Sequence, residues 1–373
     1  MTTFLTTLLL SLRRAPVHLA IAALAVAFGA AESASAQDTA ACWTPGELAH
    51  RPGEEKIQKK IKNASIAPPQ RALASYSPAP QRGIVRRVKL PAGKKLIALT
   101  FDLCEQPSEI AGYQGGIVDY LRANRIKATF FVGGKWMLSH RDRAQQLMAD
   151  GLFEVANHAW AHRNLRNLSG RALTDEVRNV QLAYEQVRDD LAAKQCIGMD
   201  GRTPAAQQAP RRLGLFRFPF GACSPEALAE VAAQGLMPIQ WDVSSGDPAV
   251  GLPATTMTQN VLASVRPGSI VLFHANGRGW STEAALPGIV TALRAKGYEF
   301  ATVTELLAAG EPVMSETCYD SRPGDTDQPR PPRPPAISSW FGPFVSPDAP
   351  TGSVRSPSRS WPSFLTAPRP QAR

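Results

Sequence analysis

The stretch LIALTFD, residues 96–102, is an apolar run of β-favouring residues that ends in an aspartate. A short apolar run of this kind is typical of a buried strand in a parallel sheet. Two similar runs follow, ATFFV at 128–132 and FEVA at 153–156, and segments with helical periodicity lie between them. This alternation of strands and helices indicates an α/β domain built on a parallel sheet.

The alternation continues to about residue 309. Further apolar runs predict strands at 214–218, 236–241, 269–273 and 298–302. Periodic segments predict helices at 172–194, 224–234, 255–265, 282–296 and 303–309. About seven strands, each followed by a helix, predict a barrel-like α/β domain of parallel strands over residues 96–321.

The first 36 residues have the pattern of a secretory signal peptide. Paired arginines precede an apolar run at 18–31, and small residues suited to cleavage stand at 34–36. The apolar run is short for a membrane anchor. We therefore expect residues 1–36 to be removed and the protein to be exported to the periplasm or the extracellular space.

The net charge of +10 is concentrated in the segments that flank the domain. Residues 37–95 hold 12 basic and 4 acidic residues, residues 322–373 hold 7 and 3, and residues 96–321 hold 20 and 23. This slightly acidic middle argues against nucleic-acid binding. We expect a basic, proline-containing linker or arm at 37–95 and a disordered tail at 322–373, which has 13 prolines in 52 residues. Either arm would suit contact with an anionic polymer of the cell envelope.

Ionisable residues stand at the ends of the predicted strands, where the active sites of parallel barrels lie. These residues are Asp102, His158, Arg217, Asp247 and His274.

His158 and His162 are four residues apart, so on a helical turn both imidazoles would share one face. That geometry suits two ligands of one divalent ion. Two histidines leave the metal open among Zn, Co, Mn and Ni. A third, carboxylate ligand is expected from the segment 100–105.

Five short motifs in this order resemble those of the polysaccharide deacetylases, a type of carbohydrate esterase with the NodB homology domain. The motifs are Thr100-Phe101-Asp102, Asn157-His158-x-x-x-His162, Arg217-x-Pro219-x-Gly221, Trp241 followed by Asp247, and Leu272-x-His274. The resemblance covers residues 96–310. It implies a distorted (β/α) barrel and a metal-dependent hydrolase that removes N-acetyl groups from amino sugars of chitin-like polymers or peptidoglycan.

The resemblance also implies roles for the matching residues. Asp102 matches the catalytic base, and Arg217 matches the arginine that orients it. His274 matches the general acid, and Asp247 matches the carboxylate paired with that acid. Such an arrangement agrees with general acid–base chemistry, in which a carboxylate activates water and a histidine protonates the departing amine.

The remaining matches concern the metal and the substrate. His158 and His162 match the metal-binding histidines. Leu272 would line the pocket for the acetyl methyl group, and Trp241 would line the same pocket.

One position departs from the family pattern. The family usually has a second aspartate, a metal ligand, where this chain has Leu103. Glu105 lies two residues further, so in an extended chain it would point to the same side with a longer reach. We expect Glu105 to be the substitute ligand. Two alternatives stay open, namely that Asp102 does both jobs or that the Cys104 thiolate is the ligand.

The five cysteines suit an oxidising compartment, although their connectivity does not follow from the sequence. Cys104 and Cys223 both follow site motifs, which favours a disulfide between them. Cys42 and Cys318 flank the domain as a second pair, and Cys196 is then left over.

The sequence therefore predicts an exported, metal-dependent N-deacetylase of a polysaccharide. One alternative is a deacetylase-fold protein that has lost catalysis and binds glycan, for which Leu103 is the main argument. The other is a hydrolase of a different acyl or C–N substrate, because related barrels hydrolyse C–N bonds in other molecules.

Overall fold

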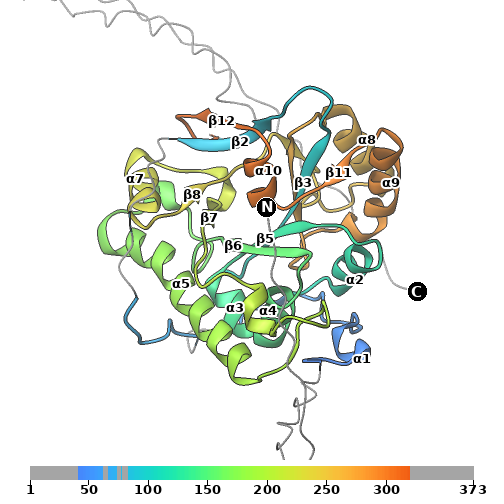
Figure 1. Cartoon of the computed structure of the whole chain (residues 1–373). Helices are drawn as coiled ribbons and strands as arrows, with labels where there is room; N and C mark the ends of the chain where they lie inside the picture. Colours follow the sequence, from blue (N-terminus) through green and yellow to red (C-terminus); the bar gives the residue numbers. More distant parts are fainter. Residues whose placement is uncertain (1–40, 62–65, 74–76, 78–82, 320–373) are drawn as a thin grey trace, which may run out of the picture. The chain divides into compact units, whose positions relative to one another are not determined.

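The computed structural model describes residues 41–61, 66–73, 77 and 83–319, and the structural statements below concern these residues. Its main sheet has eight strands, all in parallel pairs (Figure 1). The order is β8-β7-β6-β5-β3-β10-β9, and β11 pairs with the start of β3. The strands are β3 (Leu96–Leu103), β5 (Ala128–Val132), β6 (Phe153–Asn157), β7 (Leu215–Phe216), β8 (Met237–Pro238), β9 (Val243–Ser244), β10 (Ile270–His274) and β11 (Glu299–Phe300). The sheet curls into part of a barrel, which confirms the predicted fold class.

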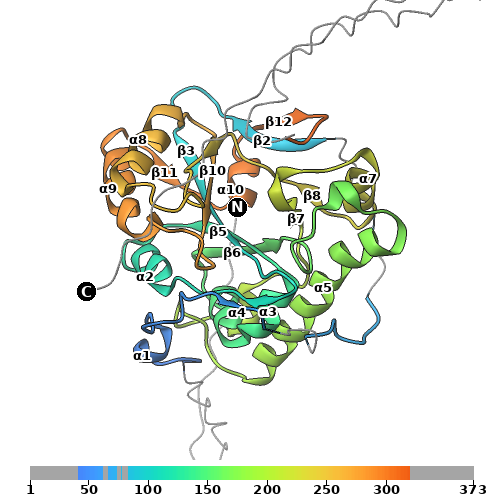
Figure 2. The same cartoon turned by 180° about the vertical axis from the view of Figure 1, so that it is seen from behind.

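Helices surround the curled sheet (Figures 1 and 2). They include α2 (Gly115–Ala123), α3 (Gly134–Ser139), α4 (Arg141–Met148), α5 (Gly170–Ala193), α7 (Pro225–Ala233), α8 (Ala254–Ser264), α9 (Thr282–Ala295) and α10 (Val303–Ala308), together with the short α6 (Ala205–Gln208). In α5 the buried residues Leu173, Val177, Val180 and Tyr184 recur at helical spacing, so one stripe of the helix faces the core. The sequence pattern missed α3 and β9, which are both short.

Alternate residues of β3 enter two different layers of the core. Leu99, Phe101 and Leu103 belong to the cluster that includes the helices, whereas Ala98 belongs to a smaller cluster made mainly of the residues inside the curled sheet. Because side chains of a strand alternate between its faces, Asp102 points to the inside together with Ala98. Leu103 thus lies on the helix side.

The register of the strands gathers the predicted site residues at one edge. His274 of β10 pairs with Asp102 of β3, and Asp102 pairs in turn with Phe131 of β5. Asn157 at the end of β6 pairs with Val132. Since neighbouring strands are about 4.8 Å apart, this register brings the side chains at the carboxyl ends within reach of one another.

A second, two-stranded sheet lies beside β8 (Figure 1). It pairs β2 (Ile84–Lys89) antiparallel with β12 (Glu311–Ser315). Val85 forms a parallel bridge to Ile239, just after β8, and β2 also accepts and donates backbone hydrogen bonds near β8 and before β10. The pair therefore borders the main sheet on the side where the barrel is incomplete.

Parts of residues 37–95 pack as structured segments, which differs from the linker or arm that composition predicted. These segments are α1 (Pro45–Leu48), β1 (Gln58–Lys59), which pairs with β4 (Glu109–Ile110), and β2. Short segments of this kind owe their order to contacts with distant parts of the chain, and local periodicity carries no sign of such contacts.

The disulfides differ from the predicted pairing. They join Cys42 to Cys196 and Cys223 to Cys318, and Cys104 is free and buried. Pairing requires cysteine Cα atoms within about 7 Å of each other, and only the folded arrangement of the flanking segments decides which ones meet that condition.

The predicted signal peptide at 1–36 and the predicted tail at 322–373 lie outside the described residues. Among the residues that the structure does describe, no helix has the length and apolar character needed to cross a membrane.

Candidate active site

A cavity of about 300 Å³ lies at the carboxyl ends of the strands. Leu272 and Trp241, the two residues predicted to form a substrate pocket, both line it. Asp102, His162 and His274 line it as well. The other lining residues are Gln106, Phe218, Phe220, Ser244, Pro248, Arg278 and Tyr319.

Asp102 is held by Arg217, and both side chains are buried. Arg217 Nη1 donates to Asp102 Oδ1 over 2.8 Å, and its Nη2 donates to the carbonyl of Gln240 over 3.2 Å. The guanidinium carbon lies 3.9 Å from the centre of the Phe131 ring. Burial by itself would raise the pKa of Asp102, but the positive charges of its histidine and arginine neighbours lower it. Asp102 is therefore a carboxylate at neutral pH.

His158 is oriented by a backbone contact. Its Nδ1 lies 2.9 Å from the carbonyl oxygen of Arg217, which fixes Nδ1 as the donor and leaves the lone pair on Nε2. That buried Nε2 has no hydrogen-bond partner, and Asp102 Oδ2 lies 3.3 Å from it. Burial lowers the pKa of His158 despite the nearby Asp102 charge, so the ring is neutral.

The loop that follows β6 brings His162 to His158 without a helix. Ala159 and His162 have positive φ angles of 63° and 52°, which end any helical path between the two histidines. The ring centroids are 5.1 Å apart. The prediction that the two rings are neighbours is confirmed, but the predicted helical turn is wrong.

Buried polar side chains hold this loop in place. Asn157 Oδ1 accepts from the Ala159 amide over 3.0 Å, and Asn157 Nδ2 donates to the Val177 carbonyl over 2.9 Å. Glu176 Oε2 accepts from the Ala161 amide over 3.0 Å. These hydrogen bonds stabilise the left-handed residues, whose conformation is otherwise unfavourable.

Glu105 does not join the histidine pair, contrary to the prediction. Its carboxylate is buried and accepts hydrogen bonds from Ser139 Oγ over 2.7 Å and from the Ala111 amide over 3.2 Å. Glu105 does lie on the same side as Leu103, but that side faces the helices and not the histidine pair, and Glu105 contacts Ser139 of α3 there.

Cys104 takes the place beside the histidines instead. A ligand atom of Cys104, one of His158 and one of His162 all lie within 4.8 Å of one another. The His162 Nδ1 atom, like His158 Nε2, is buried without a hydrogen-bond partner in the described residues. Burial lowers the pKa of His162 well below its usual value. Two neutral imidazoles with free nitrogen atoms and a nearby thiol fit a divalent metal ion.

His274 and Asp247 form the opposite side of the site. His274 Nδ1 lies 2.9 Å from Asp247 Oδ1, and the His274 amide donates to Asp247 Oδ2 over 2.6 Å. Thr282 Oγ1 donates to the same Oδ2 over 2.8 Å. Burial would lower the pKa of His274, but the charge and hydrogen bond of Asp247, followed by the charge of Asp102, raise it.

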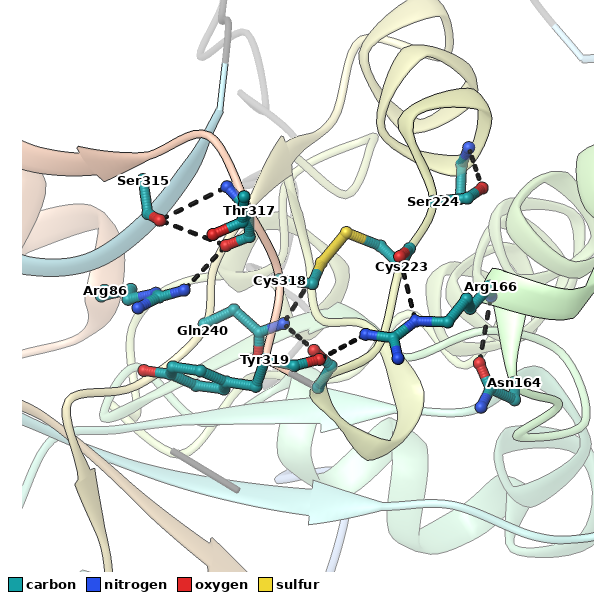
Figure 3. Close-up of a disulfide and its surroundings, with 12 residues drawn as sticks. Arg86, Asn164, Arg166, Cys223, Ser224, Gln240, Ser315, Thr317, Cys318 and Tyr319 are labelled. Carbon is teal, nitrogen blue, oxygen red and sulfur yellow. Dashed lines mark hydrogen bonds between the residues drawn. A yellow bond between two sulfur atoms is a disulfide. The ribbon is translucent and has the colours of Figure 1, made fainter. Parts of the chain in front are cut away.

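The sequence reasoning missed Tyr319, which lines the cavity from the far end of the domain. It directly follows Cys318, whose disulfide with Cys223 ties it to the loop after β7 (Figure 3). Arg166 Nη2 donates to the Tyr319 carbonyl over 2.6 Å, and the Arg86 guanidinium stacks 4.1 Å above its ring. The neighbouring Cys318 could have pointed to Tyr319, but only if its disulfide with Cys223 had been predicted.

Two further residues belong to the cavity wall, Phe220 within the third motif and Arg278, which the sequence analysis missed. Phe220 is 60% exposed, and its ring lies 4.6 Å from that of His162. Its φ of 61° is left-handed, an uncommon conformation for a residue other than glycine. Arg278 Nη2 donates to both carboxylate oxygens of Glu109, over 2.9 and 2.7 Å. The sequence held no signal for Arg278.

Comparison with known proteins agrees with the motifs. Residues 89–195 match the family described as Polysaccharide deacetylase. The chain is 28% identical over 285 residues to the peptidoglycan-N-acetylglucosamine deacetylase PgdA of Listeria monocytogenes, covering 74% of this chain and 52% of that protein. It is 29% identical over 231 residues to a chitooligosaccharide deacetylase of Bradyrhizobium, covering 58% of this chain and 92% of that protein. The chain spans about half the length of the Listeria relative.

A solved structure shares the fold. It is the crystal structure of the Bc1960 peptidoglycan N-acetylglucosamine deacetylase, bound to a hydroxamate-type benzamide. The match covers 62% of this chain and 96% of that one. The TM-score is 0.50 at 23% identity. The resemblance inferred from the five motifs is thus supported over residues 89–195, which match the polysaccharide deacetylase family, and by similarity to relatives named as deacetylases.

Proposed function

We propose that this protein is a metal-dependent hydrolase that removes N-acetyl groups from amino sugars of a polysaccharide. One observation carries the proposal. An ionised carboxylate, Asp102, and a carboxylate-paired imidazole, His274, line the same 300 Å³ cavity, next to two imidazoles whose buried ring nitrogens have no partner. A cavity that holds a base, an acid and free metal ligands suits hydrolysis of an amide.

In this proposal Asp102 accepts a proton from the water that attacks the acetamide carbonyl. Arg217 holds one carboxylate oxygen, Oδ1, and keeps the group ionised, while Oδ2 is left to face His158 and the cavity. Arg217 acts as a positioning residue, because it reaches the substrate only through Asp102.

His274 donates the proton that the departing amine needs. Its Nδ1 is engaged by Asp247, so Nε2 is the atom that carries the proton into the cavity. The raised pKa of His274 favours its protonated form. The water oxygen first bonds to the carbonyl carbon, and the C–N bond breaks once the nitrogen has received the His274 proton, so that acetate and a free amino sugar leave.

His158 and His162 would hold the divalent ion, in their neutral forms and through nitrogens that have no other partner. The ion would supply Lewis-acid polarisation of the acetyl oxygen. Their orientation is already set, by the Arg217 carbonyl for His158 and by the loop after β6 for His162.

The apolar part of the cavity suits the acetyl methyl group. Leu272 and Trp241 line it and are mostly buried. An apolar wall beside the reacting carbonyl excludes water from the methyl side and favours acyl groups of small size.

The substrate class follows from the relatives, which are named as deacetylases of peptidoglycan N-acetylglucosamine or of chitooligosaccharides. Such polymers lie outside the cytoplasm, which fits the signal-peptide pattern at 1–36. We propose that the protein is exported, and that the basic segment 37–95 and the proline-rich segment 322–373 contact the envelope.

The test is acetate release by the purified mature protein. The substrates are chitooligosaccharides and peptidoglycan, each assayed after chelation and again after adding back Zn, Co, Mn or Ni. Acetate release that depends on added metal supports the proposal, and unchanged release after complete chelation contradicts its metal part.

Two other results would replace the proposal. Metal binding without acetate release from either polymer would favour a different acyl or C–N substrate. Glycan binding without metal or acetate release would favour a catalytically inactive binding protein, the alternative that Leu103 suggests.

A further inference from the structure

We propose that Cys104 is the third protein ligand of the ion, so that the centre is a Cys-His-His site with a thiolate where a carboxylate was expected. The inference rests on the proposed function only in that both need a metal at His158 and His162. It concerns the identity of the ligands and is tested separately from the deacetylase activity.

The first argument is the juxtaposition of the three donor atoms. They lie within 4.8 Å of one another, His162 lines the cavity, and the two imidazole nitrogens named above have no hydrogen-bond partner. Ligands about 2.1–2.3 Å from a tetrahedral zinc ion lie roughly 3.5 Å apart. The three donor atoms would have to move about 1 Å closer together to bind one ion, and side-chain rotations of small size achieve this.

The second argument is that each donor is oriented from behind. Asn276 is fully buried, and its Nδ2 donates to both Cys104 Sγ, over 3.1 Å, and the Cys104 carbonyl, over 2.9 Å. His158 is oriented in the same manner by the Arg217 carbonyl. Hydrogen bonds of this kind to the outer side of a ligand are usual in metal centres. Burial, followed by the charge of Asp102, raises the pKa of the Cys104 thiol, so a bound cation is needed to displace its proton.

The third argument is elimination among the nearby candidates. Glu105 is occupied by Ser139 and by the Ala111 amide. Asp102 gives Oδ1 to Arg217 and is not part of the described three-residue group. Leu103 has no donor atom.

The cysteine pairing agrees with this assignment. Four cysteines form two disulfides, and Cys104 keeps its thiol although the other cysteines of the chain are oxidised. On metal binding the S–H bond breaks, a sulfur–metal bond forms and the proton goes to solvent. A thiolate with two imidazoles favours Zn or Co over Mg, Ca or Mn.

The experiment uses the mature chain with both disulfides intact, stripped of metal and titrated with Co²⁺. Thiolate ligation produces an intense sulfur-to-cobalt charge-transfer absorption in the near ultraviolet, which nitrogen and oxygen ligands do not. We expect this band in the wild type at one equivalent of cobalt. We expect Cys104→Ser to lose the band and to weaken zinc binding roughly 100-fold.

Glu105→Gln is the matched control, because it alters the neighbouring carboxylate that the sequence favoured. It should keep the band and bind zinc within about threefold of the wild type. Cobalt bound without the band in the wild type, or a band that Glu105→Gln abolishes, would overturn the inference. The wild-type spectrum decides the question even where Cys104→Ser does not fold.

The result is also independent of the acetate assay. A cobalt–thiolate band without acetate release would uphold the Cys104 ligand and reject the deacetylase. Metal-dependent acetate release without the band would uphold the deacetylase and reject the Cys104 ligand.

Discussion

The two sides of the cavity differ in how fully their polar groups are satisfied. On the side of β10, Asp247 accepts hydrogen bonds from the His274 ring, the His274 amide and Thr282. On the side of β6, His158 and His162 keep buried ring nitrogens with no partner. Buried polar atoms nearly always find partners, so a cluster without them indicates a missing ligand. The polar groups on one side are thus paired, whereas the other side keeps two buried ring nitrogens that suit the proposed metal ion.

The largest effect should come from removing a proposed metal ligand on the β6 side of the cavity. His158→Ala removes one imidazole and should lower kcat/KM by about 10³-fold or more, because the metal and its polarising effect are lost together. Isothermal titration with Zn²⁺ and acetate release measure the two losses. Full activity in a variant that binds no metal would refute the assignment.

Asp102→Asn separates the base from the metal on that same side. The amide keeps the shape and can accept one hydrogen bond from Arg217, but it cannot remove a proton from water. We expect a loss of about 10³-fold in kcat with zinc affinity within about tenfold of the wild type. A variant that lost the metal as completely as His158→Ala would instead make Asp102 a ligand.

Asp247→Asn alters the satisfied side and should change the pH profile. The raised pKa of His274 means that its protonated form persists above the ordinary value, so activity should fall only as the pH rises through that raised pKa. Without the carboxylate charge the alkaline limb should move to lower pH, and kcat/KM at neutral pH should fall about 10²-fold. Metal affinity should not change. An alkaline limb that stays in place would show that another group is the acid.

The same pair contributes to stability with a definite sign. Because folding raises the pKa of His274, its contribution is fully present below the unfolded pKa near 6.5 and is lost as the pH rises through the folded value. Thermal unfolding of the wild type and Asp247→Asn at several pH values between about 5 and 9 would measure this difference. The difference in stability between the wild type and Asp247→Asn should become smaller as the pH rises.

The smallest effect on catalysis should come from changing the part of the cavity wall that contains Tyr319. Cys318→Ser releases the segment that places Tyr319 in the cavity, so KM should rise several-fold while kcat changes little. Cys42→Ser is the matched control, because its disulfide with Cys196 involves no residue of the cavity. Each variant should lose about 2–5 kcal/mol of stability, measured by denaturant unfolding. An equal KM in both variants would show that the Tyr319 wall does not contact the substrate.

Most of the chemistry could be predicted because the residues that carry it stand beside strand ends. Asp102 and His274 end adjacent strands in register, so knowing the strands already placed them together. The third ligand could not be predicted in this way. The alternation rule placed Glu105 on the side of Leu103, but only the folded structure shows that this side faces the helices, where Glu105 contacts Ser139.

The sequence by itself predicted most of the strand and helix order, the resemblance to the polysaccharide deacetylases and the residues proposed as acid, base and metal ligands, because these follow from local periodicity and from short motifs. Tertiary structure alone decided the disulfide pairing, the ordering of parts of 37–95, the Tyr319 wall and the approach of Cys104 to the histidines. Each of these depends on contacts between segments far apart in the chain. Their formation is governed by the packing of the whole domain, which local sequence does not encode.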